Sequence, residues 1–153
     1  MKLLRSTPHQ ADLGLAIIRT IVGLVFAVHG AQKLFVFGFA GVTGAFTQMG
    51  IPMASIAGPA VALLEFLGGI ALIVGLLTRF AGLGLAINML GAILFVHAKA
   101  GFFAPNGIEF VLTLLAGAAA LSVAGAGRYS IDALIASRAD SSSSPAFGLK
   151  RAA

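Results

Sequence analysis

The chain has 153 residues, of which 59% are apolar and only 10% are charged, and its mean hydropathy is +1.03. Soluble domains carry about 25% charged residues, so the composition excludes an ordinary soluble protein and predicts an integral membrane protein of one domain. The formal net charge is +5 and cysteine is absent, which excludes disulfides and thiol redox chemistry within the chain itself.

The first apolar stretch, residues 13–31, is long enough to predict a membrane span. It follows a basic start, as the core of a secretory signal does, but it contains Arg19 and exceeds the core length of about 7 to 15 residues that cleaved signals have. We therefore expect this span to be retained. Like the later apolar stretches, it is a continuous run rich in Leu, Ala, Ile and Gly, whereas a β-barrel would show alternating segments.

The connector at residues 34–52 is too apolar for an ordinary loop and too rich in glycine for a regular span. It predicts a short interfacial helix from Val42 to Met49, which Gly50 and Pro52 would end. Two interpretations of the connector remain open. It is either a plain apolar link or a lid over a cavity in the outer leaflet.

Residues 53–77 predict a second span, with Glu65 at its centre and no other ionisable group in it. A helix of this length would measure roughly 37 Å, more than the roughly 30 Å of bilayer hydrocarbon, so Glu65 is expected near the membrane midplane. A very short turn then leads to a third span at residues 80–97, which must run antiparallel to the second and contains Asn88. A connector rich in turn-forming residues precedes a fourth span at residues 108–126.

Together these stretches predict an all-α fold: a four-helix membrane bundle over residues 1–136, with the short interfacial helix between the first two spans. Residues 137–153 are rich in serine and predict a disordered tail. Four spans place both termini on one side of the membrane, and most basic residues fall there, so the positive-inside rule predicts cytoplasmic termini. The basic residues on that side are Lys2, Arg5, Arg79, Arg128, Arg138, Lys150 and Arg151, against Lys33 and Lys99 on the other.

Three polar residues are expected inside the membrane at adjacent depths. Counting about 1.5 Å per residue from the cytoplasmic helix ends places Arg19, Asn88 and Glu65 at neighbouring levels. An unpaired charge at such a depth costs about 2.5 to 3.5 kcal/mol, so we predict a buried network in which Asn88 bridges the guanidinium and the carboxylate. In the alternatives, Arg19 extends to the cytoplasmic interface, and Glu65 is a protonated carboxyl that only sets helix register.

A second polar cluster is expected at the outer ends of the spans. His29 and His97 fall at equal depth, with Lys33 and Glu109 slightly above them, and these four residues form a candidate small-molecule pocket under the connector. Two histidines without a third ligand at suitable spacing do not favour a metal site, and a bound haem is not favoured either.

Four ordered segments carry a resemblance to a known family. They are Leu15-Ala16-Ile17-Ile18-Arg19 leading to His29-Gly30-Ala31-Gln32-Lys33-Leu34-Phe35, then Leu64-Glu65-Phe66-Leu67-Gly68-Gly69, Asn106-Gly107-Ile108-Glu109-Phe110, and Gly127-Arg128-Tyr129-Ser130-Ile131-Asp132. In these segments the chain resembles the DoxX family of small bacterial four-helix membrane proteins, which is named for a membrane subunit of a thiosulfate:quinone oxidoreductase. The resemblance implies Arg19, His29, Lys33, Glu65 and Glu109 as the site positions.

Three functions follow as hypotheses. The first is a membrane subunit of a redox assembly in the bacterial cytoplasmic (inner) membrane, which holds a quinone or similar small molecule in the outer pocket and contacts a soluble or membrane redox partner. It could be a non-catalytic subunit and could form homo-oligomers. The second is a small transporter or proton-conducting protein that uses Glu65 and Arg19. The third is a purely structural membrane adaptor. The basic residues lie beside membrane ends rather than in a patch, which predicts contact with lipid and not with nucleic acid.

Overall fold

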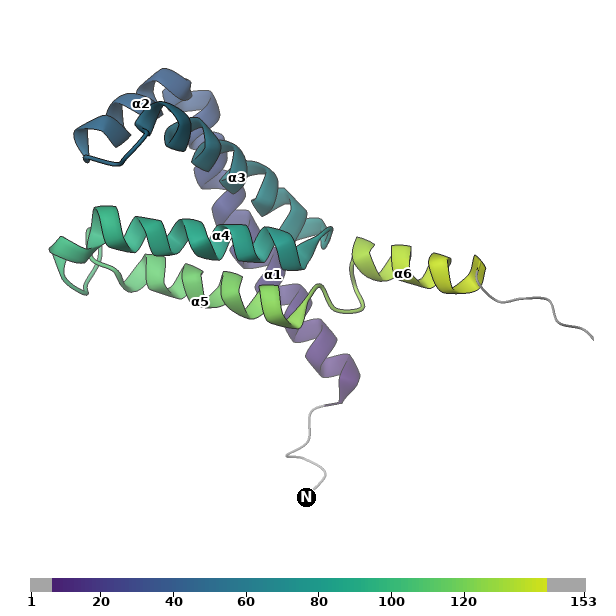
Figure 1. The fold of residues 1–153 in the computed structure, drawn as a ribbon. Coiled ribbons are helices and arrows are strands. Elements are labelled where there is room, and N and C mark those ends of the chain that lie inside the picture. The colour runs from purple at the N-terminus through teal and green to yellow at the C-terminus, as the bar shows by residue number, and fades with distance from the viewer. Residues whose placement is uncertain (1–6, 143–153) are drawn as a thin grey trace, which may run out of the picture.

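The computed structural model describes residues 7–142, and in this range the protein is all-α without strands, which confirms the predicted fold class (Figure 1). Its elements are α1 (Pro8–Ala31), the π-helix η2 (Gln32–Phe37), α2 (Gly38–Gln48), α3 (Ala54–Val74), α4 (Thr78–Ala92), the π-helix η3 (Ile93–His97), the 3₁₀-helix η4 (Ala98–Ala100), α5 (Glu109–Ala124) and α6 (Ile131–Ser142). The basic residues Lys2, Arg5, Lys150 and Arg151 lie outside the described residues.

Within residues 7–142, three helical segments are long and apolar enough to cross a membrane: residues 8–48, 54–74 and 78–100. The first of them includes α2, which folds back from the end of α1 (Figure 1). The predicted fourth span corresponds to α5, which has only 16 residues and would measure about 24 Å. It is shorter than expected because Gly125, with a φ of +84°, ends the helix.

Helix α1 begins at a capping box and packs closely against α3. The Thr7 side chain accepts a hydrogen bond from the Gln10 backbone N–H, and the Gln10 side chain accepts one from the Thr7 N–H. Further along, glycines bring the two backbones together. A Cβ added to Gly30 would lie 2.2 Å from the Phe66 nitrogen, and one added to Gly69 would lie 2.4 Å from the Ala27 nitrogen, so larger residues would push α1 and α3 apart.

Helices α4 and α5 form a second close pair and complete the bundle. A Cβ on Gly82 of α4 would lie 2.8 Å from the Ala118 carbonyl oxygen of α5, which shows how near the two backbones are. The buried core lies between α1, α3, α4 and α5. Its larger members are Phe26, Leu72, Leu85, Met89, Val111, Leu114 and Leu121.

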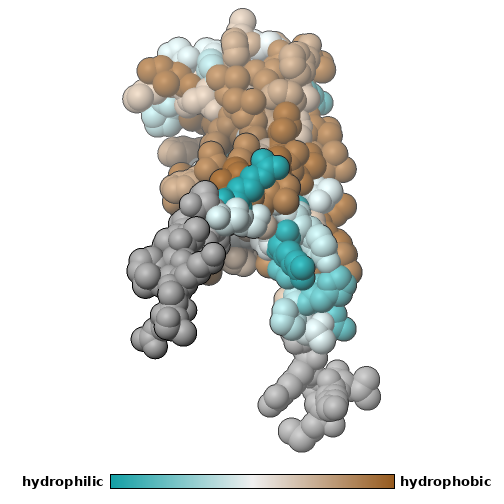
Figure 2. All heavy atoms as spheres, turned by 90° about the vertical axis from the view of Figure 1, so that its right-hand side faces the viewer, coloured by the Kyte–Doolittle hydropathy of each residue, from teal (hydrophilic) through white to brown (hydrophobic). Residues whose placement is uncertain are grey.

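The outer surface of the bundle is strongly apolar, as a lipid-facing surface must be. Large side chains on one face of α1 are about half exposed or more, among them Ile17, Ile21, Leu24 and Val28. Figure 2 shows brown, hydrophobic residues over most of the coloured surface on one face, with teal, hydrophilic residues mostly in its lower part. An apolar surface of this extent is incompatible with an aqueous monomer, so these helices contact lipid.

Two parts of the sequence differ in extent from their prediction. The connector helix begins at Gly38 rather than Val42 and is α2, whose Val42 is buried against Gly58 of α3. Residues 137–142, assigned to the disordered tail, belong to α6, whose first turn is capped by the Ser130 hydroxyl, which accepts from the Ala133 N–H. Residues 143–153 lie outside the described residues. Figure 1 shows α6 projecting at the end of the bundle opposite α2.

Candidate functional site

A cavity of about 620 Å³ lies between α1, α2, α3, α4, η3 and α5. Its polar lining residues are His29, Lys33, Glu65, Asn88 and His97. The rest of its wall is almost entirely apolar and includes Phe26, Phe46, Met49, Met89, Phe95 and Phe110. An apolar cavity with a few polar side chains is typical of a site for a small amphiphilic molecule.

Glu65 is the centre of the polar wall and is only 4% exposed. Its Oε2 atom forms an ion pair with the Lys33 ammonium, and its Oε1 atom accepts a hydrogen bond of 3.0 Å from Asn88 Nδ2. Both carboxylate oxygens therefore have a partner from a different segment, η2 and α4. The ion pair and hydrogen bond compensate the cost of burying the two charges.

The predicted pairing of Glu65 with Arg19 is wrong, because the structure places their side chains at different levels. Arg19 Nη2 donates a hydrogen bond of 2.7 Å to the Tyr129 carbonyl oxygen. Side chains on a helix point towards its N-terminus. This direction carries the Arg19 side chain away from Glu65, and it brings the Lys33 side chain, from further along the chain, back towards Glu65. Counting depth by backbone position alone missed this effect.

Three of the four residues predicted for the outer pocket line the same cavity as Glu65, so the predicted network and the predicted pocket are one site. They are His29, Lys33 and His97, whereas Glu109 lies outside the cavity lining. The Glu109 carboxylate instead accepts a hydrogen bond of 2.9 Å from the Ala104 backbone N–H and so shapes the loop before α5. The His29 ring lies 6.1 Å from the Phe110 ring and connects α1 to α5.

His97 has a fixed tautomer. Its Nδ1 atom lies 2.8 Å from the Asn106 carbonyl oxygen, and because a carbonyl only accepts, Nδ1 must carry the proton when the ring is neutral. Its Nε2 atom is then a hydrogen-bond acceptor, and the residue lines the cavity. The cavity thus has donors on Lys33 and Asn88 and an acceptor on His97. Among the residues that the structure describes, no group of three or more His, Asp or Glu side chains could hold a metal ion.

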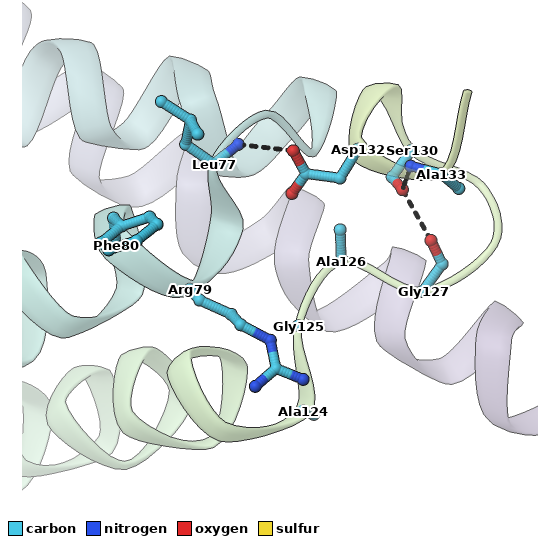
Figure 3. A pocket seen from close by; sticks show the side chains of 10 residues that line it. All are labelled: Leu77, Arg79, Phe80, Ala124, Gly125, Ala126, Gly127, Ser130, Asp132 and Ala133. Atoms are coloured by element: carbon cyan, nitrogen blue, oxygen red, sulfur yellow. Dashed lines mark hydrogen bonds between the residues drawn. The ribbon is translucent and has the colours of Figure 1, made fainter. Parts of the chain in front are cut away.

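The opposite end of the bundle carries a smaller hollow of about 380 Å³ between the α3–α4 turn and the segment after α5 (Figure 3). Asp132 accepts hydrogen bonds from the backbone N–H groups of Leu77, at 2.8 Å, and Thr78, at 3.0 Å, and so caps α4. The Arg79 side chain reaches Gly125 at the end of α5. Asp132 was missed as a cap because it lies 55 residues from Leu77 in the sequence.

Arg19 belongs to this second end. It is 3% exposed, and its guanidinium occupies the space beside Gly75, where an added Cβ would lie 1.4 Å from Arg19 Nη1. Within residues 7–142, its Nε and Nη1 atoms have no hydrogen-bond partner. Arg19 thus joins α1 to the segment around Tyr129 and to the α3–α4 turn. Its role in these contacts is structural.

Comparison with known proteins gives a consistent result. Residues 14–98 match the DoxX family model, and residues 59–148 match the model described as "TQO small subunit DoxD". No solved structure matches the chain.

Three of the relatives found are 33% to 36% identical to the chain over the aligned residues. "Putative oxidoreductase CatD" of Bacillus subtilis is 33% identical over 103 residues, which cover 67% of this chain and 74% of the relative. The inner membrane protein YqjF of Escherichia coli is 36% identical over 129 residues, 81% of this chain and 93% of the relative. An uncharacterized membrane protein of Mycobacterium tuberculosis is 35% identical over 133 residues, 80% of this chain and 81% of the relative. Since the DoxX model matches more than half of its length, the chain belongs to the DoxX family.

Proposed function

We propose that this protein is a membrane subunit of a redox assembly and that it binds a quinone, or a similar lipid-soluble carbonyl compound, in the cavity around Glu65. The observation that carries this proposal is the Lys33–Glu65 ion pair in the wall of an otherwise apolar cavity. Two names found by comparison support the redox part: the DoxD model is that of a TQO small subunit, and CatD is named as an oxidoreductase.

The chemistry of the cavity suits a quinone at each step. The Lys33 ammonium has three N–H groups, and the one contact to Glu65 leaves others to donate to a quinone oxygen. When two electrons arrive from a redox partner, negative charge develops on the quinone oxygens, and a nearby ammonium stabilises it. Two protons complete the quinol. These protons come from water, and the groups in the wall that can relay them are His29, Lys33, Glu65 and His97.

The proposal includes an orientation in the inner membrane. With both termini in the cytoplasm, the Arg19 end of the bundle faces the cytoplasm and the cavity lies towards the outer face. The basic residues Arg79, Arg128 and Arg138 are then on the cytoplasmic side. A redox partner would contact the protein at either end of the bundle. The bundle is also compatible with a homo-oligomer.

The test is binding of a labelled quinone to the purified protein in lipid nanodiscs, with protein-free nanodiscs to subtract partitioning into lipid. We expect Lys33→Met to weaken binding by about tenfold or more, because a charge-assisted hydrogen bond of about 1.5 to 3 kcal/mol is lost. Lys99→Met is the matched control, since Lys99 is exposed and does not line the cavity. Equal affinities of Lys33→Met and the parent would contradict the assignment of the site.

The alternative of a transporter driven by Glu65 and Arg19 receives no support from the geometry, because the two side chains do not contact each other. Proton flux driven by a pH gradient across proteoliposomes would decide whether Glu65 conducts protons with Lys33, rather than Arg19, as its partner.

A further inference from the structure

We infer that the cavity opens sideways into the bilayer between α3 and α4, and that the apolar chain of the bound molecule leaves the cavity through this opening. We call it the lateral opening; Ala57 and Val61 of α3 form one side, and Gly91 and Ala92 of α4 form the other. The inference rests on the proposed function and deepens it, because it specifies the ligand class: a polar ring with an attached hydrocarbon chain.

The packing of α3 against α4 changes along their length. Near their connecting turn they are in contact, since a Cβ on Gly68 would lie 3.3 Å from Leu85 and one on Gly84 would lie 3.2 Å from Leu64. The hydrogen bond from Asn88 to Glu65 bridges them one turn further on. Beyond this bridge the cavity separates the two helices, and Figure 1 shows them diverging away from the turn.

Gly91 is the residue that keeps the α4 side of the opening free. A Cβ added to Gly91 would meet no atom within 4 Å, whereas one added to Gly23, Gly69 or Gly82 would meet backbone atoms at 2.9 Å or less. Those three glycines are required for helix packing and Gly91 is not. Glycine weakens a helix interior relative to alanine, so its effect here is to leave space on the cavity wall.

Side chains from several other elements form the remaining sides of the cavity. The end of α2 and the turn after it cover one end through Phe46, Met49 and Pro52, and the loop before α5 adds Pro105 and Gly107. Between α1 and α5, the His29 and Phe110 rings lie 6.1 Å apart, and both residues are exposed. The side between α3 and α4 is flanked by lipid-facing residues.

Exposed apolar side chains flank the lateral opening. Ile56 on α3 is 63% exposed and Leu94 on η3, which follows α4, is 62% exposed, so both face lipid. The polar groups Glu65 and Asn88 lie at the inner end of the opening. A bound molecule would therefore place its oxygens at Lys33 and its hydrocarbon chain between α3 and α4.

The experiment compares two quinones with the same ring, one carrying a ten-carbon chain and one without a chain, in phosphatidylcholine nanodiscs. In Gly91→Leu the added side chain fills the opening, and we expect the affinity for the chain-bearing quinone to fall about tenfold. The affinity for the chainless quinone should stay within about twofold, because its ring binds at Lys33 without using the opening. Gly44→Leu is the matched control, because a Cβ at Gly44 also meets nothing within 4 Å and Gly44 does not line the cavity.

The outcomes separate the two proposals. If the parent protein binds neither quinone, the proposed function fails and the inference fails with it. If the parent binds both and Gly91→Leu weakens both equally, or neither, the lateral opening is excluded while the proposed function stands. Should Gly91→Leu fail to fold, Ala57→Leu tests the opposite side of the opening with the same two ligands. Loss of the chain-bearing quinone alone supports the inference in either variant.

Discussion

The two ends of this bundle each contain a cation from the first helical segment, Arg19 buried and Lys33 partly buried, and the two cations do different things. Lys33 pairs with a carboxylate in the wall of a cavity of about 620 Å³. Arg19 donates to a backbone carbonyl and packs against Gly75, and it does not line the smaller hollow at its end of the bundle. The difference teaches that burial of a charge in a membrane helix does not by itself mark a functional site. Whether the charge belongs to a functional site depends on the space around it and on its partners.

The largest effect is expected from removing one member of the Lys33–Glu65 pair. Glu65→Ala leaves Lys33 without a countercharge and should lower the free energy of unfolding by about 3 to 5 kcal/mol. The double variant Lys33→Met, Glu65→Leu should recover most of this stability, because apolar residues replace a buried ion pair well. Equilibrium unfolding in mixed micelles measures both values.

The same double variant separates a functional pair from a structural one. We expect it to fold and yet to bind quinone at least tenfold more weakly than the parent, a difference of about 1.4 kcal/mol. A folded double variant with full ligand binding and activity would favour the structural adaptor and would remove the distinction between the two ends.

A smaller effect, on stability only, is expected at Arg19. Arg19→Leu loses the hydrogen bond to the Tyr129 carbonyl, and hydrogen bonds to charged groups contribute about 1.5 to 3 kcal/mol, so the unfolding free energy should fall by about that amount. Quinone affinity in nanodiscs should be unchanged, since Arg19 does not line the cavity. If Arg19→Leu abolishes binding in a folded protein, the Arg19 end is functional after all.

The smallest effect is expected from Asp132. Asp132→Ala removes the cap on the backbone N–H groups of Leu77 and Thr78, and loss of a cap costs about 1 kcal/mol. We expect faster hydrogen exchange of these two amides and no change in ligand binding. Asp132→Asn, which retains a side-chain acceptor, is the control and should lose less.

Much of the fold could be predicted because membrane helices follow from composition and length. Apolar runs predicted α1, α3 and α4 within a few residues, and α5 with less success. The connector helix was predicted with a later start, because the connector is too rich in glycine for a regular span, whereas α2 begins at Gly38. The length of α6 was underestimated, since its serine-rich end resembles a disordered segment and its cap at Ser130 depends on the turn before it.

The candidate site was predicted residue by residue but not as an arrangement. His29, Lys33, Glu65, Asn88 and His97 were all selected for being polar among apolar residues, and all line one cavity. The pairing of Glu65 with Arg19 was wrong, and Glu109 was placed in a pocket that it does not line. Depth along a helix is available from residue number, whereas side-chain direction and the partners across helices are not.

The sequence alone determined that this is an all-α membrane protein of the DoxX type and which of its residues must be buried polar groups, because hydrophobic length and isolated charges are properties of the chain. Only the tertiary structure decided that Lys33 rather than Arg19 neutralises Glu65, that Asp132 caps α4, and that Gly91 borders an open space. Each of these depends on contacts between segments far apart in the chain, and their physical origin is the direction of side chains along a helix and the divergence of α3 from α4.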